Sequence, residues 1–340
     1  MKNFRRIFVI LFLALLSVSL FALPGVEETF QTESGQYVYY RDYRLENPLY
    51  IGFLYYGEDM IQVRYLLKAE GKNLVQDKSF SIYFSLDEKA NHLELTGEKL
   101  PEGITNDDTE IVNYIHSILY EFASMRIHSN DEVFFDVFTK TQDVPYFGGQ
   151  IQVTYDEQIP VFNIESIDSV SGEKIFKAVT MGSINDNADM SFEKFSGFVD
   201  FPSRPKSKKL SSKKLADFIW NDSEDVPNLK TLGDNAVLWN LEMDIPKSEF
   251  SKRGVTVDQY FSRANRMSLN GSYVYLPEAK CFKKGDNLIC CYPLYSPSET
   301  NPFRYVVKVF EKNEGSYTLT IISTYFNFYW ENKQYFDTLY

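Results

Sequence analysis

Histidine and cysteine are scarce in this sequence, with three of each among 340 residues. His92 lies in a strand-like stretch, and His116 and His128 fall in a stretch with helical periodicity. None of the three has a second His or Cys at a spacing that binds zinc, so we predict no metal site. The sequence also contains no cofactor-binding motif, and we predict that the protein uses no cofactor.

Catalytic motifs are missing as well. The sequence has no G-x-S-x-G elbow, no H-E-x-x-H pair and no glycine-rich phosphate loop. The oxygen-rich stretch at Asn185, Asn187 and Asp189 lacks the glycine that turns a calcium loop, because Met190 takes its place. We therefore favour a non-catalytic protein. The 47 acidic residues leave one enzymatic alternative, a hydrolase that uses a pair of carboxylates.

Long apolar runs are absent except at the N-terminus. There, basic residues precede an apolar stretch from Ile7 to Phe21, and Ala22 offers a small residue for cleavage. This pattern is typical of an export signal, so we predict a signal peptide at residues 1–22 and a periplasmic or extracellular location. An uncleaved membrane anchor is the alternative. No later stretch is apolar enough to cross a bilayer, so we predict that the chain is not an integral helical membrane protein.

Positive charge is in deficit. The chain has 35 Lys and Arg residues against 47 Asp and Glu, which gives a net charge of −12 at pH 7. A surface of this sign repels the phosphates of nucleic acids. We therefore predict no nucleic-acid partner.

Aromatic residues, by contrast, are abundant. They make up 16% of the chain, and they favour β-strands. Polar and apolar residues alternate from Ile61 to Tyr65 and from Phe80 to Phe84, as in antiparallel sheets with one solvated face. We predict an α+β fold of predominantly antiparallel β-sheet. The predicted helices are one long helix at about 107–128 and two shorter helices at about 212–220 and 257–267.

The long helix is marked by apolar residues at spacings of three and four. They are Ile111, Val112, Ile115, Ile118, Leu119, Phe122 and Met125. This stripe predicts a helix that packs on a sheet with one face and meets solvent with the other. We predict Asp107 as its N-cap, with Glu110 completing a capping box.

A segment rich in proline, serine and positive charge interrupts the strand pattern at residues 201–214. Its basic residues are Arg204, Lys206, Lys208, Lys209, Lys213 and Lys214. We predict a basic Pro/Ser linker or exposed loop, with docking to an acidic partner or a head group as the alternative. It separates a β-rich lobe with the long helix, at residues 23–200, from a β-rich C-terminal lobe at residues 215–340.

The C-terminal lobe contains an aromatic cluster at the end of a strand predicted from Tyr317 to Phe328. Its members are Tyr325, Phe326, Phe328, Tyr329 and Trp330. Aromatic residues of exported β proteins can line a surface for lipid, peptide or glycan, so we predict these as ligand-binding residues. Packing in the hydrophobic core is the alternative.

A hairpin is predicted around Gly285-Asp286, because a glycine in the first position suits a two-residue turn. Counting outward from this turn places Cys281 directly opposite Cys290, in a pair with Cα atoms about 4.5 Å apart. A disulfide can span that distance, and an oxidising compartment favours it. We therefore predict a Cys281–Cys290 disulfide and a free, buried Cys291.

Together these observations predict an exported, non-catalytic protein of the bacterial envelope that binds a hydrophobic ligand or another envelope component. An exported carboxylate-dependent hydrolase is the first alternative. An outer-membrane β-barrel is the second, suggested by the aromatic C-terminal residue Tyr340. The predicted helix in the middle of the chain argues against the barrel.

Overall fold

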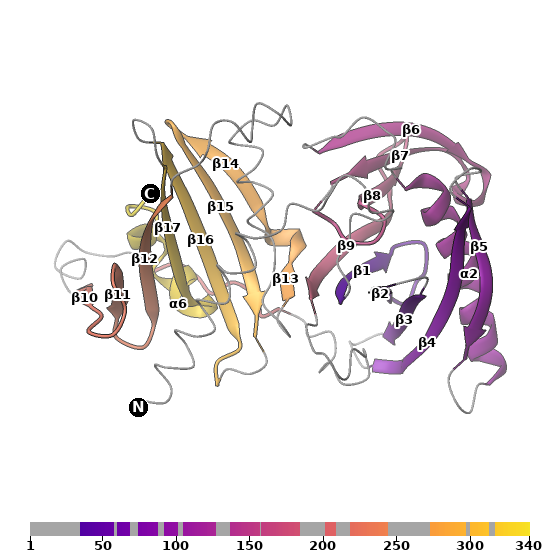
Figure 1. Cartoon of the computed structure of the whole chain (residues 1–340), viewed down its shortest axis with the longest axis horizontal. Coiled ribbons are helices and arrows are strands. Elements are labelled where there is room, and N and C mark those ends of the chain that lie inside the picture. The colour runs from indigo at the N-terminus through magenta and orange to yellow at the C-terminus, as the bar shows by residue number, and fades with distance from the viewer. Residues whose placement is uncertain are drawn as a thin grey trace. The chain divides into compact units, whose positions relative to one another are not determined.

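The structure is a computed structural model that describes residues 35–57, 60–68, 74–87, 92–100, 105–126, 137–156, 158–183, 201–208, 218–243, 273–296, 300–312 and 317–340. These residues form two compact units. Unit 1 contains the described residues up to 183, and unit 2 contains those from 201 onward. Both are built mainly from antiparallel strands, and the longest described helix lies in unit 1 (Figure 1). The chain has the predicted α+β fold.

Unit 1 is built on one antiparallel sheet. Its described strands are β1 (Gln36–Asp42), β2 (Leu49–Gly57), β3 (Met60–Lys68), β4 (Leu74–Asp87), β5 (His92–Lys99), β6 (Phe138–Val144), β7 (Gly149–Tyr155), β8 (Ile164–Ser169) and β9 (Lys174–Ser183). Chain neighbours pair from β1 to β5 and from β6 to β9, and β1 also pairs with β9. The described strands therefore follow the order β5-β4-β3-β2-β1-β9-β8-β7-β6.

The helix α2 (Asn106–Met125) confirms the predicted long helix but begins one residue earlier. Its N-cap is Thr105, whose side chain forms a capping box with that of Asp108. The prediction of Asp107 and Glu110 as the capping pair was therefore wrong. A Thr followed three residues later by a carboxylate satisfies the same motif two residues upstream. The last two residues of the predicted helix lie outside the described part of the chain.

The apolar stripe of α2 packs on the sheet around Phe122, which has no exposed surface. The centroid of its ring lies 4.9 Å from that of Tyr40 on β1, 6.1 Å from that of Phe53 on β2 and 5.4 Å from that of Phe176 on β9. Phe162, in the turn before β8, lies 5.7 Å away. Since β9, β1 and β2 are adjacent, α2 covers the middle of the sheet.

Unit 2 is built on a second antiparallel sheet. Its described strands are β10 (Asn221–Asp222), β11 (Leu229–Leu232), β12 (Ala236–Met243), β13 (Tyr273–Tyr275), β14 (Lys280–Lys284), β15 (Asn287–Tyr295), β16 (Phe303–Lys312) and β17 (Tyr317–Tyr325). They follow the order β10-β11-β12-β17-β16-β15. β14 and β13 pair with the two ends of the remaining side of β15.

Two short helices cover one face of this sheet, α6 (Phe326–Glu331) and α7 (Lys333–Phe336). In Figure 1, α6 lies beside β16 and β17. The strand predicted from Tyr317 to Phe328 was therefore wrong over its last three residues. Phe326, Tyr329 and Trp330 are buried, and their spacing of three and four residues brings them to one face of a helix.

Turns adjoin β8 and β13. β8 begins at Ile164, after a turn with positive φ at Val161 and Asn163. The 3-10 turn η2 (Leu276–Glu278), which contains Pro277, separates β13 from β14. The helix predicted at 212–220 is described only at 218–220, which are irregular, and that at 257–267 lies outside the described residues.

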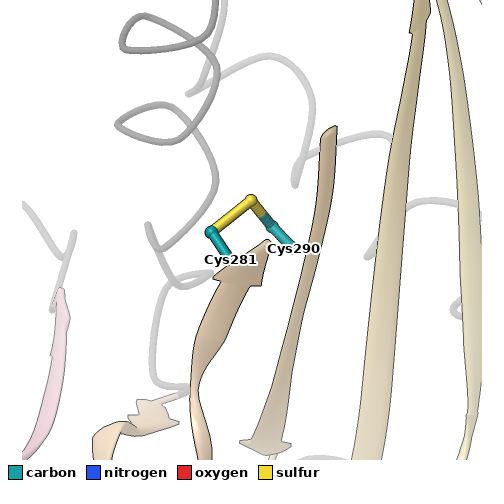
Figure 2. The surroundings of a disulfide bond; sticks show 2 residues. All are labelled: Cys281 and Cys290. Atoms are coloured by element: carbon teal, nitrogen blue, oxygen red, sulfur yellow. A yellow bond between two sulfur atoms is a disulfide. The ribbon is translucent and has the colours of Figure 1, made fainter. Parts of the chain in front are cut away.

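The predicted hairpin and disulfide are confirmed. Cys281 on β14 is opposite Cys290 on β15, their Cα atoms are 4.1 Å apart, and their sulfur atoms are bonded (Figure 2). Gly285 in the turn has a φ of +64°, a conformation that favours glycine. Cys291 is free and buried.

The predicted signal peptide at residues 1–22 lies outside the described part of the chain. Of the predicted linker, residues 201–208 are described and 209–214 are not. Among the described helices, none has the length and apolar character needed to cross a membrane.

Candidate functional site

The candidate site is a short segment of unit 2 together with the side chains on which it lies. Residues 201–208, here called the strap, form neither helix nor strand. Their sequence is F-P-S-R-P-K-S-K. The strap contacts Tyr275, Glu278, Phe303, Phe326, Trp330 and Glu331, which are here called the strap-binding surface.

Phe201 places an aromatic ring among three others. It stacks on Tyr275, with ring centroids 4.8 Å apart and an interplanar angle of 22°. Its centroid also lies 5.3 Å from that of Phe303 and 6.1 Å from that of Phe326, both in edge-to-face geometry. Such pairs add about 0.5–1.5 kcal/mol to the free energy of apolar burial. Phe201 therefore anchors the N-terminal end of the strap.

The Arg204 side chain contacts two residues of the strap-binding surface. Its guanidinium carbon lies 4.1 Å from the ring centroid of Trp330, and its Nε lies 3.1 Å from Oε2 of Glu278. A guanidinium suits both contacts, because it is planar and permanently charged. The Arg204 side chain is 48% exposed, so we expect the ion pair alone to contribute less than about 1 kcal/mol.

Lys208 fixes the C-terminal end of the strap to α6. Its backbone N–H donates a hydrogen bond of 2.8 Å to the carbonyl of Glu331. Its Nζ lies 2.5 Å from Oε2 of the same residue. The strap is therefore held at its N-terminal end by the ring of Phe201, and at its C-terminal end by the backbone hydrogen bond and the ion pair of Lys208.

The two prolines of the strap are three residues apart. Pro202 and Pro205 are half-buried, whereas Ser203, Lys206 and Ser207 are exposed. A P-x-x-P sequence favours the polyproline II helix, which has three residues per turn and therefore brings both prolines to one face. Recognition of such segments uses aromatic side chains, and the residue before each proline contacts one of them, since Phe201 stacks on Tyr275 and Arg204 lies over Trp330.

Acidic side chains give the strap-binding surface its charge. Glu278 and Glu331 are partly exposed, with 21% and 34% of their side-chain surface accessible. Burial raises the pKa of the Tyr305 phenol on β16 and of the Tyr329 phenol in α6, so both are neutral at physiological pH. The strap-binding surface is therefore aromatic and acidic, and it matches the proline-containing, basic strap.

The five predicted ligand-binding residues do not form one open surface. Phe326, Tyr329 and Trp330 are at most 8% exposed and belong to the core of unit 2. Phe328 packs against that core, and Tyr325 lies at the end of β17, with the guanidinium carbon of Arg304 4.0 Å from its ring centroid. Of the five, Phe326 and Trp330 contact the strap.

Glu278 and Glu331 were not predicted from the sequence, and Arg204 was predicted only as part of a basic segment. The missed signal was the P-x-x-P spacing of Pro202 and Pro205 beside positive charge. The two glutamates had no such signal, because any of the 47 acidic residues could have met the strap.

A second polar cluster lies in unit 1, between the end of β1 and α2. Asp42 is 1% exposed, accepts a hydrogen bond from the hydroxyl of Tyr114 and pairs with Arg44 at 3.3 Å. Burial alone would lower the pKa of Arg44, but the hydrogen bond to Asp42 and the charge of that carboxylate, with smaller contributions from Tyr114 and Tyr146, together outweigh it, and the pKa is raised. Around Arg44, four rings have centroids within 5.3 Å of its guanidinium carbon: Tyr114, Tyr146, Phe147 and Phe176. These contacts hold the chain after β1 against α2.

The part of the chain that the structure describes adds no candidate residues for metal binding. Within the described ranges, no three His, Cys, Asp or Glu side chains cluster in a way that could hold a metal ion. His116 packs edge-on against Phe80, with ring centroids 5.9 Å apart. The carboxylate-dependent hydrolase stays a prediction.

Comparison with protein families gives one match for each part of the chain. Residues 35–193 match a domain of unknown function, DUF7954, and residues 207–340 match another, DUF7955. The first match covers all of the described unit 1. The second includes the last two residues of the strap and the described remainder of unit 2. No curated protein matches the chain.

Proposed function

We propose that the chain is an exported, non-catalytic binding protein of the bacterial envelope. In this proposal, unit 2 binds an extended, proline-containing and basic segment of another envelope component. The observation that carries it is the strap, which lies on an aromatic and acidic surface through Phe201, Arg204 and Lys208. The strap serves as an internal occupant of a surface that recognises segments of the same chemistry.

The nature of the strap contacts supports a displaceable occupant. Arg204 and Lys208 are about half exposed, at 48% and 59% of the side chain, and exposed ion pairs contribute little to stability. No described hydrogen bond of the strap backbone belongs to a sheet, and the one involving Lys208 joins a single residue of α6. A partner segment could therefore replace the strap without breaking β-sheet pairing.

The aromatic residues favour a peptide segment over a buried hydrophobic ligand. Phe326 and Trp330 use most of their surface in the core of unit 2, which leaves only part of each ring for a ligand. A flat aromatic area with acidic neighbours suits proline rings and basic side chains. Of the two predicted ligand classes, we therefore propose the envelope component.

Export is supported by two features of the chain. The N-terminal sequence has the pattern of a signal peptide, and the Cys281–Cys290 disulfide suits an oxidising compartment. Mass analysis of the protein isolated from its native cell tests this part. We expect the mature chain to begin near Leu23, and an intact Met1 on membrane-bound protein would contradict it.

The binding experiment measures how a labelled peptide with the strap sequence binds to full-length protein carrying Phe201→Ala. This substitution weakens the contact between the attached strap and the strap-binding surface. Fluorescence anisotropy should show saturable binding. Replacing both Glu278 and Glu331 by Gln in that protein should weaken binding about 3- to 10-fold, because two ion pairs of about 0.3–0.7 kcal/mol each are lost. Glu311→Gln removes an exposed acidic residue elsewhere in unit 2 and serves as the control. No binding, or equal losses in both variants, would contradict the proposal.

A further inference from the structure

The Cys281–Cys290 disulfide, drawn in Figure 2, joins two residues that differ in exposure. Among the described strands, β14 pairs with β15. Cys281 on β14 is half-buried, while Cys290 on β15 is 1% exposed. A thiol in solvent therefore reaches the sulfur of Cys281 more readily than that of Cys290.

Cys290 has a cationic neighbour on its own face of the sheet. Lys308 on β16 is directly opposite Cys290, and opposite residues of antiparallel strands have Cβ atoms about 4.5–5.5 Å apart. Lys308 is 5% exposed. Burial lowers its pKa to about 8, so its ammonium group donates a proton more readily than that of an ordinary lysine.

Thiol–disulfide exchange depends on these two differences. The attacked sulfur must be accessible, and the reaction is faster when the departing thiolate is stabilised. A neighbouring positive charge stabilises a thiolate. In this hairpin Cys281 is the more exposed of the two cysteines, and Cys290 is paired across the sheet with Lys308.

We propose that Cys281–Cys290 is a redox-active disulfide that reacts with a dithiol reductant, with Cys281 as the attacked residue and Lys308 as the proton donor to Cys290. The first thiolate of the reductant forms a bond to Sγ of Cys281, and the bond between the cysteines breaks. Its electron pair passes to Sγ of Cys290, which takes a proton from the Lys308 ammonium. The second thiolate of the reductant then attacks the reductant sulfur of the mixed disulfide. Cys281 leaves as a thiolate that takes a proton from solvent, and the reductant becomes a disulfide.

Cys291 takes no part in this exchange. It points to the opposite face of β15 from Cys290, and its partner across the pairing is Lys280. To meet Cys281 it would need a shift of the pairing by one residue, which would turn every side chain of β14 to the other face. Reduction therefore removes the disulfide without a substitute, and β14 is left to its backbone pairing with β15.

A monothiol traps the first step. Oxidised, folded full-length protein is treated with excess glutathione, quenched in acid, unfolded, alkylated and mapped by mass spectrometry. We expect glutathione on Cys281 and the alkylating reagent on Cys290. Glutathione on Cys290, or reaction only after unfolding, would overturn the proposal.

The role of Lys308 is tested by the rate of reduction with dithiothreitol under native conditions. Lys308→Met keeps the buried chain length, and we expect reduction about 5- to 10-fold slower than in the wild type. Lys280→Gln removes an exposed lysine from the same strand as Cys281 and should leave the rate unchanged. An unchanged rate in Lys308→Met, with the oxidised protein shown to be folded by near-UV circular dichroism, would contradict the assignment of Lys308.

Discussion

Arg204 lies over Trp330, with its guanidinium carbon 4.1 Å from the ring centroid, and it also pairs with Glu278 at 3.1 Å. One basic side chain thus joins an aromatic and an acidic residue of unit 2. Phe201 and Lys208 extend the same combination to both ends of the strap. These contacts identify the chemistry that the strap-binding surface accepts, which is a basic side chain placed between an aromatic ring and a carboxylate.

Weakening the strap should expose it to proteases. Phe201→Ala removes a half-buried ring, which costs about 1–2 kcal/mol and raises the open population of the strap about 5- to 30-fold. We expect trypsin to cut after Lys206 and Lys208 faster by a similar factor, as measured by mass spectrometry over time. Ser203→Ala, at an exposed position of the same segment, is the control. Equal cleavage of the two variants would show that the strap is not held by Phe201.

Gly52 on β2 accommodates the ring of Tyr39, which is its partner on β1. A Cβ atom at position 52 would lie 2.6 Å from Cε1 of Tyr39, whose side chain is 1% exposed. We expect Gly52→Ala to lower the free energy of unfolding by about 1–3 kcal/mol, measured by urea denaturation. Gly97→Ala on β5, whose Cβ would have no atom within 4 Å, should be nearly neutral. A neutral Gly52→Ala would contradict this packing.

Asp108 couples the N-terminus of α2 to the sheet. Its carboxylate accepts hydrogen bonds from Lys78 at 2.7 Å, from Thr105 and from the Tyr65 hydroxyl at 2.9 Å. The hydrogen bond from Lys78, followed by that from Thr105, holds the pKa of Asp108 well below its usual range. The folded state therefore binds fewer protons than the unfolded state as pH falls below about 4.

The stabilisation from Asp108 is consequently complete above that pH and is lost in more acidic solution. We expect Asp108→Asn to cost about 2–3 kcal/mol at pH 7, and this cost should shrink below about pH 4, where the carboxyl of the unfolded wild type takes up a proton. Urea denaturation of both proteins at pH 7, 5 and 3 measures it. A cost that stays constant down to pH 3 would contradict the depressed pKa.

Lys308 should destabilise the folded protein at neutral pH. Its pKa is lowered by burial to about 8, so the folded state binds fewer protons than the unfolded state between pH 8 and about 10.4. We expect Lys308→Met to raise the free energy of unfolding by about 1–3 kcal/mol at pH 7. This advantage over the wild type should decrease from pH 8 to pH 9.5.

Burial also raises the pKa of Cys291, and this thiol changes the free energy of unfolding in the opposite direction over the same pH range. Because Cys291 is present in both the wild type and Lys308→Met, the difference between the two proteins reports on Lys308. Urea denaturation of the oxidised proteins at the two pH values provides the measurement. An advantage that grows with pH would contradict the direction of the shift.

Local patterns in the sequence were enough to predict the main helix and the disulfide hairpin. The stripe from Val112 to Met125 repeats at helical spacing, and the turn at Gly285 fixes which residues face each other. Both depend on residues close in the chain. The end of β17 was misjudged for the same local reason, since alternation up to Tyr325 gave no sign that Phe326 begins a helix.

The candidate site could not be predicted from local patterns. The residues that meet in it are far apart, as with Lys208 and Glu331, which are separated by 123 positions. Nothing near Glu278 in the sequence indicates that Arg204 pairs with it. Such contacts follow from the packing of α6 on the unit 2 sheet, which joins elements from both ends of the unit.

The most direct test of the central claim compares the affinity of the labelled strap peptide for wild-type protein and for the Phe201→Ala variant. In the wild type the peptide competes with the attached strap, whose effective concentration is on the order of 1 mM. For a peptide with a Kd of about 100 μM at the vacant surface, and a strap weakened about 5- to 30-fold in the variant, this competition predicts binding about four- to eightfold weaker to the wild type than to the variant. Equal affinities would place the peptide away from the strap-binding surface and would contradict the account.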